Sequence, residues 1–149
     1  DSDGYLDLAV SHSHGIPPEP GGTRLTIFLN RSPTWSTLGH SLPSSDGIPL
    51  LAGAGEPIPD QLVSVTVSLV TPPVLGLLFT GFNADFAAFQ GGVLLPSSDV
   101  VVPIRPGLPL EQRWPQGILP GTPVYLQAWF QSLLAGEVSA SNALVTIAH

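Results

Sequence analysis

The chain has 149 residues, with 11 acids against four basic residues that are all arginine, and it contains no lysine, cysteine or methionine. The net charge of -7 argues against a nucleic-acid partner, which needs a basic face, and the missing cysteines remove disulfides, thiol redox catalysis and thiolate metal sites. Its 17 prolines and 16 glycines leave no room for long helices, so the composition predicts an all-β fold.

The chain opens with Asp-Ser-Asp-Gly-Tyr-Leu-Asp-Leu, which has the spacing of a calcium loop. Hard divalent cations take oxygen ligands from alternate side chains of a tight loop and from a carbonyl beyond its glycine. With Gly4 at the sharp turn, the predicted ligands are the side chains of Asp1 and Asp3, the carbonyl of Tyr5 and the carboxylate of Asp7. The first acid of such a loop would lie two positions before Asp1, so one ligand is missing, and the alternative is a solvated acidic turn.

Two strands are predicted around a polar loop, over residues 5–10 and 23–30, because apolar and polar residues alternate in both segments. The order Asp-x-Asp-Gly-x-x-Asp-Leu-Ala-Val, a loop, then Leu-Thr-Ile-Phe-Leu-Asn resembles the FG-GAP or VCBS-type repeat, the calcium-binding blade unit of integrin α-subunit propellers and of many bacterial secreted proteins. The resemblance covers residues 1–35 and implies calcium at the acidic loop. A propeller needs several four-stranded blades, so this chain is not a propeller by itself.

The Ser/Pro/Gly-rich segment 36–47 is interpreted as a linker, and residues 48–149 as an immunoglobulin-like β-sandwich domain. Short apolar segments between turn signals predict strands at 48–52, 62–70, 74–80, 93–95, 100–104, 124–131 and 143–148, and a single helical turn is expected within 82–89. The order Gly-Gly-Val-Leu-Leu-Pro, Tyr-Leu-Gln-Ala, Ser-Asn-Ala-Leu-Val-Thr-Ile also resembles a β-sandwich module at the C-terminal ends of large secreted bacterial proteins.

Residues 61–80 carry no charge, so their length alone would permit a membrane span. Val63, Val65 and Val67, however, alternate with polar residues, and two prolines then interrupt the segment. A two-residue period is typical of strands, so we predict two strands joined by a turn.

Other candidate sites are each weighed against an ordinary structural role. His12 and His14 could hold a transition metal but have no third ligand nearby, His40 and His149 have no local partner, and Asn30-Arg31-Ser32 fits a glycosylation triplet. The aromatic residues Trp114, Tyr125 and Trp129 could form a carbohydrate platform, although the face that Tyr125 and Trp129 share in their strand could equally be a second buried layer or a subunit contact. No nucleophile with a base, and no paired acid and base, is evident, so no enzymatic activity is predicted.

A lone pair of strands is at best marginally stable in water, so the apolar faces of the N-terminal unit need cover. We therefore expect a secreted, extracellular or cell-surface structural protein without enzymatic activity, which binds calcium and self-associates through β-strand addition, with no membrane span. The alternatives are the C-terminal fragment of a larger adhesion or carbohydrate-binding protein with an upstream propeller, and an enzyme accessory domain.

Overall fold

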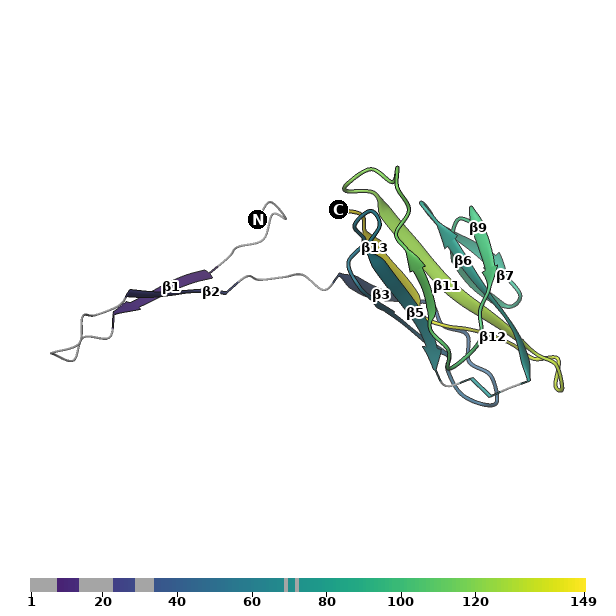
Figure 1. Ribbon diagram of the computed structural model, residues 1–149. Helices are drawn as coiled ribbons and strands as arrows, with labels where there is room; N and C mark the ends of the chain where they lie inside the picture. Colours follow the sequence, from purple (N-terminus) through teal and green to yellow (C-terminus); the bar gives the residue numbers. More distant parts are fainter. Residues whose placement is uncertain (1–7, 14–22, 29–33, 69, 72) are drawn as a thin grey trace. The chain divides into compact units, whose positions relative to one another are not determined.

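The computed structural model describes residues 8–13, 23–28, 34–68, 70–71 and 73–149, and the chain divides into two compact units, Asp1–Pro33 and Thr34–His149. Throughout these described residues the secondary structure consists of antiparallel strands and turns, without a helix, as the composition predicts (Figure 1).

The N-terminal unit contains one antiparallel ladder, formed by β1 (Leu8–Ser13) and β2 (Thr23–Phe28). Its register places Leu8 opposite Phe28 and Ser13 opposite Thr23. Residues 8–10 of the strand predicted over 5–10 belong to β1, and residues 5–7 lie outside the described residues. The predicted calcium ligands Asp1, Asp3, Tyr5 and Asp7 lie outside the described residues, as do His14 and the glycosylation triplet.

The C-terminal unit contains a three-stranded sheet of order β10-β5-β4 and a six-stranded sheet of order β3-β13-β11-β6-β9, with β12 paired to β11, and a separate hairpin of β7 and β8. These strands are β3 (Trp35–Gly39), β4 (Leu50–Ala54), β5 (Leu62–Ser68), β6 (Val74–Gly81), β7 (Ala84–Phe89), β8 (Gly92–Pro96), β9 (Val100–Pro103), β10 (Leu110–Arg113), β11 (Pro123–Ser132), β12 (Val138–Ala140) and β13 (Ala143–Ile147).

One apolar core joins the two sheets. Val63, Val65 and Val67 of β5 point into it with at most 6% exposure, and Ala128 and Phe130 of β11 meet them from the other sheet. Each large apolar side chain buried in this way contributes about 1.5–3 kcal/mol. The alternation predicted for residues 62–70 is therefore confirmed over Leu62–Ser68, and the two strands predicted within residues 61–80 correspond to β5 and β6. No helix in the described part of the chain has the length and apolar character needed to cross a membrane.

A second, smaller core covers the other face of the six-stranded sheet. Phe79 and Trp129 of that sheet pack with Leu94 of the β7–β8 hairpin. The ring of Phe89 meets Phe79 edge to face at 5.7 Å and Trp129 at 4.9 Å. The hairpin thus forms a third layer, and the second face of β11 is buried beneath it.

Two buried amides hold these layers together. The Gln127 side chain accepts a hydrogen bond from the Leu95 N–H of β8 at 2.9 Å and donates to the carbonyls of His40 and Ser141. The Asn142 Oδ1 accepts from the Leu51 N–H at 2.8 Å, and its Nδ2 donates to the Leu51 carbonyl at 3.1 Å. Asn142 therefore pairs with β4 as a neighbouring strand would.

Two segments differ from the sequence interpretation. The expected linker 36–47 contains most of β3, which pairs with β13, and Leu42 exchanges backbone hydrogen bonds with Ala140. The expected helical turn within 82–89 is β7, which pairs with β8. Backbone pairing decides the structure in both segments, with a distant strand for β3 and with the next strand of a hairpin for β7. The strands β10 and β12 are also absent from the sequence prediction.

Candidate functional site

The proposed aromatic platform does not form. Trp114 and Trp129 are each 4% exposed and belong to different cores, while Tyr125 is half-buried. Stacking on a sugar requires an accessible ring face, which neither tryptophan offers. Of the three interpretations of the second face of β11, a second buried layer is the one that the structure confirms.

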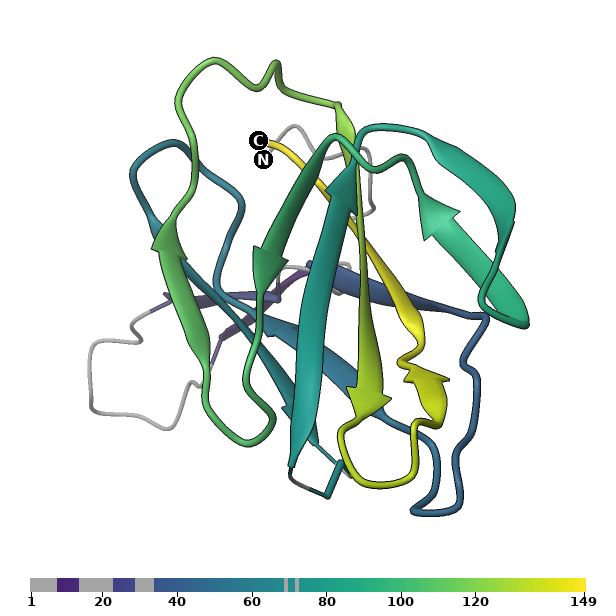
Figure 2. The ribbon, with the colours of Figure 1, turned by 90° about the vertical axis from the view of Figure 1, so that its right-hand side faces the viewer.

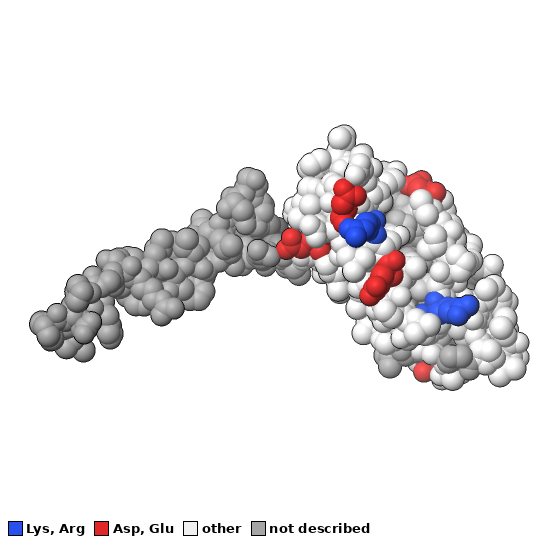
Figure 3. All heavy atoms as spheres, viewed as in Figure 1, with Lys and Arg blue, Asp and Glu red and all other residues white. Residues whose placement is uncertain are grey.

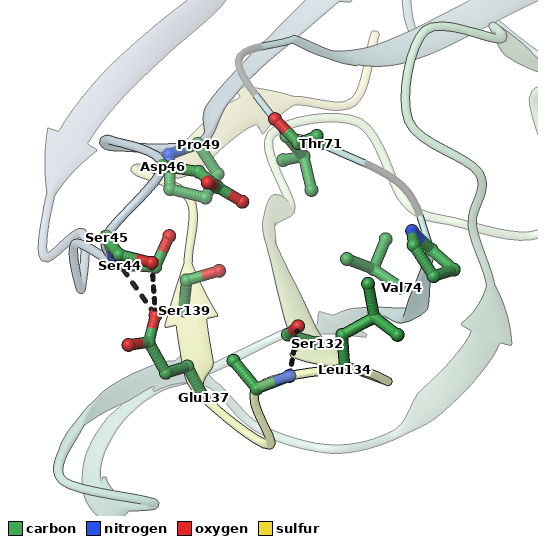
Figure 4. Close-up of a pocket in the computed structure, with 13 residues that line it drawn as sticks. Ser44, Ser45, Asp46, Pro49, Thr71, Val74, Ser132, Leu134, Glu137 and Ser139 are labelled. Atoms are coloured by element: carbon green, nitrogen blue, oxygen red, sulfur yellow. Dashed lines mark hydrogen bonds between the residues drawn. The ribbon is translucent and has the colours of Figure 1, made fainter.

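A hollow of about 230 Å³, which we call the loop hollow, lies between three loops. The backbones of these loops lie at the lower end of the C-terminal unit in Figure 2. The loops connect β3 to β4, β5 to β6 and β11 to β12. Five hydroxyl side chains, two carboxylates and six apolar side chains line it, the polar ones being Ser44, Ser45, Asp46, Thr71, Ser132, Glu137 and Ser139 (Figure 4).

Hydrogen bonds between the loops fix the walls of the loop hollow. The Glu137 Oε2 accepts hydrogen bonds from the Ser45 hydroxyl at 2.7 Å and from the Ser45 N–H at 3.1 Å. The Leu133 N–H donates to the Pro73 carbonyl at 3.1 Å. Each of these bonds joins the β11–β12 turn to one of the other two loops, so the hollow is pre-formed.

The loop hollow is acidic. The Ser45 hydroxyl and then the Ser45 N–H lower the pKa of Glu137 below its usual value, since both donate to its charged form. Asp46 adds a second carboxylate, and no lysine, arginine or histidine is among the lining residues. Anionic ligands are therefore disfavoured there.

Acid should weaken the contact between Ser45 and Glu137. Because the folded state lowers the pKa of Glu137, its contribution to the free energy of unfolding is present above the ordinary glutamate pKa of about 4.3 and is lost as the pH falls through the lower folded value. Urea unfolding from pH 3 to 7 should give a shallower acid dependence for Glu137→Gln than for the parent chain. Asp85→Asn, at an exposed acid on β7, is the control, and an equal change in both variants would contradict the assignment.

Asp99 has a structural role at the end of β6. Its Oδ2 accepts from the Phe82 N–H at 3.0 Å and from the Ser97 hydroxyl at 2.8 Å. These two donors, with Phe82 the larger contributor, lower the pKa of Asp99. This acid fixes the start of the β7–β8 hairpin.

The histidines form no metal site in the described residues, where no group of three His, Cys, Asp or Glu side chains could hold an ion. The backbone of His12 lies opposite Arg24 in the N-terminal ladder. His40 is exposed and stacks edge to face on Phe86 at 5.4 Å, and the His149 N–H donates to the Pro57 carbonyl.

The outermost strand of the hairpin is unusually exposed. Residues 85–88 of β7 are all exposed, including Phe86 at 54%, and Phe86 has a φ of 52° that non-glycine residues rarely adopt. Gln90 and Gly91 also have positive φ and form the two-residue turn to β8. We call residues 85–88 the β7 edge, because β7 pairs only with β8 in the described part of the chain.

Charges are sparse on the face of the C-terminal unit seen in Figure 3. The figure shows a few acidic and basic side chains, including one adjacent acidic and basic pair, on a largely uncharged surface. Such a face offers packing and backbone contacts more than electrostatic steering.

No protein-family model, no curated protein and no solved structure matches the chain.

Proposed function

We propose that the protein is a secreted, non-enzymatic structural component that self-associates into an extracellular assembly. In this proposal the C-terminal unit is an immunoglobulin-like β-sandwich, and the N-terminal unit is stiffened by calcium. The observation that carries the proposal is the β7 edge, an exposed strand with one unpaired side in the described residues.

Beyond the irregularity between Ala84 and Ala87, the unpaired side of β7 directs alternate backbone N–H and C=O groups outward, where another strand can bind them. The β7 edge has the sequence Asp-Phe-Ala-Ala, with one charge and no proline. Lysine, a common guard on edge strands, does not occur in the chain. Strand addition at β7 would satisfy backbone groups and cover Phe86 at the same time.

Three other edge strands of the C-terminal unit carry guards, whereas β3, which ends the six-stranded sheet, has neither a charge nor a proline. In β4 the Asn142 side chain hydrogen-bonds the N–H and the carbonyl of Leu51. Glu111 and Arg113 place charges on β10, and Pro103 of β9 has no backbone N–H to donate. These guards favour β7 over β4, β9 and β10 as the acceptor for an added strand.

The donor set of the N-terminal loop suits calcium. Asp1, Asp3 and Asp7 supply carboxylates and Tyr5 a carbonyl, all of them hard oxygen ligands. Calcium would neutralise adjacent carboxylates that otherwise repel one another, and so stiffen the residues that lead into β1.

Assembly should depend on both features. Multi-angle light scattering at increasing protein concentration should show particles larger than a monomer with calcium, and smaller ones after chelation. Ala88→Lys places a charge on the β7 edge and should reduce the association constant by tenfold or more, about 1.4 kcal/mol.

Gln112→Lys is the matched control, because it adds the same charge to an exposed position on β10, which is already guarded. Its association should equal that of the parent chain. A monodisperse monomer at high concentration, with and without calcium, would overturn the proposed function.

A further inference from the structure

We propose that the loop hollow is a receptor for a basic side chain of a partner protein, a cationic head on an apolar stem. The inference is independent of strand addition at β7. It concerns recognition of a charged side chain, and no residue of the β7 edge is among the lining residues. Ser139, the charges and the apolar walls each support it.

Ser139 is a largely buried residue whose hydroxyl opens on the hollow. It is 6% exposed, and in the described part of the chain no protein group hydrogen-bonds its Oγ, which points into the hollow (Figure 4). The Oγ is therefore available to a ligand in the hollow, unlike the Nε1 atoms of Trp114 and Trp129, which are buried without a partner. A ligand with N–H donors would satisfy its lone pairs.

Further acceptors surround Ser139. The Ser132 Oγ already accepts the Ala135 N–H at 3.1 Å and keeps a second lone pair. Asp46 directs its carboxylate toward the hollow in Figure 4, and Glu137 uses one oxygen, Oε2, for Ser45. The polar lining is thus rich in acceptors and carries two negative charges, as a guanidinium or ammonium group requires.

The remaining walls are apolar. Pro49 is buried, and Pro73, Val74 and Leu134 continue the lining, with Leu134 84% exposed. Basic side chains bury their methylene stems on such surfaces while the charged head meets polar groups. The two kinds of wall in the loop hollow match the two halves of such a side chain.

Other ligand classes fit less well. A phosphate or carboxylate would face Asp46 and Glu137 without a cation among the lining residues. A sugar would find no aromatic ring in the lining on which to stack. The volume of about 230 Å³ lies below the roughly 300 Å³ at which pockets for drug-sized ligands begin, which favours a single side chain.

The test is an NMR titration of the full chain with butylguanidinium chloride and butylammonium chloride. Saturable shifts of the amides of Ser45, Thr71 and Ser139 are expected for at least one of the two cations. Sodium butyrate and methyl glucoside should give no saturable shift there. Binding should weaken about threefold in Asp46→Asn, the size of a partly exposed ion pair, and by a similar factor in Ser139→Ala.

Asp46 is exposed, so its variant should fold normally, and Asp85→Asn on β7 is the matched control with unchanged affinity. The four basic residues of the chain are all arginine. A second copy would therefore be identified as the source by two results together: a preference for butylguanidinium, and shifts of these amides when the protein concentration is raised. A preference for butylammonium, without a concentration effect, would indicate a lysine of another protein. Absence of saturable shifts, equal binding of glucoside, or unchanged affinity in both variants would overturn the inference.

Discussion

Replacing Asn142 with alanine is expected to lower the free energy of unfolding by about 2–4 kcal/mol, because it leaves two buried backbone groups of β4 unpaired. The Asn142 side chain bonds both the N–H and the carbonyl of Leu51, and Leu51 is only 2% exposed. Water cannot readily replace the amide at that depth. Urea unfolding followed by tryptophan fluorescence measures the loss.

Two further variants separate the amide's contacts. Thr37→Val removes the third partner of Asn142, an exposed hydroxyl 3.1 Å from Nδ2, and should cost less than about 1 kcal/mol. Asn142→Asp keeps an acceptor for the Leu51 N–H but sets a carboxylate oxygen against the Leu51 carbonyl, so it should be at least as harmful as alanine. A loss below about 1 kcal/mol in Asn142→Ala would mean that the edge of β4 is held by other contacts.

The strands that the sequence predicts well are those with one buried face. Val63, Val65 and Val67 repeat every second residue and are buried, as the two-residue period requires. In β3, by contrast, four of five residues are exposed, so hydrophobic alternation is absent. Its place in the sheet comes from pairing with β13, more than 100 residues later. Just before β3, the Thr146 hydroxyl donates a hydrogen bond to the Thr34 carbonyl across 112 residues.

The β7 segment was misinterpreted for a local reason. Phe82, Phe86 and Phe89 follow the spacing i, i+4, i+7, which is typical of one helical face. The actual strand contains a register shift between Ala84 and Ala87 that breaks its two-residue period. Neither that irregularity nor the positive φ of Phe86 has a signal in the sequence.

The loop hollow could not be predicted because its walls are distant in sequence. Ser45 and Glu137 meet across 92 residues, and Ser139 belongs to a strand of only three residues. Hydroxyl-rich turns are common, and only the fold brings these three loops together. The acidic loop at Asp1, in contrast, is a local pattern, and its calcium site stays a prediction.

Replacing Gln127 with glutamate is expected to cost about 3–5 kcal/mol near neutral pH, because it places a carboxylate among acceptors in a fully buried position. The Gln127 Nε2 now donates to the carbonyls of His40 and Ser141 at 2.9 and 3.2 Å, and a charged glutamate would repel both. Burial raises the pKa of such an acid, so the penalty should grow as the pH rises above about 4.3 and be smallest below it. Urea unfolding at pH 4 and pH 7 tests the magnitude and its sign.

Gln127→Leu is the matched control for charge, since it removes the amide without adding a carboxylate, and its cost should not depend on pH. Gln127→Leu also removes the acceptor of the Leu95 N–H of β8, which Gln127→Glu keeps, so the leucine variant should loosen the hairpin that carries the β7 edge. Hydrogen exchange should therefore accelerate at Leu95 and Ala87 well before it does at Val65 in β5. If all three amides accelerate equally, Gln127 supports the whole unit and not the hairpin alone, and a change in self-association could then not be assigned to β7.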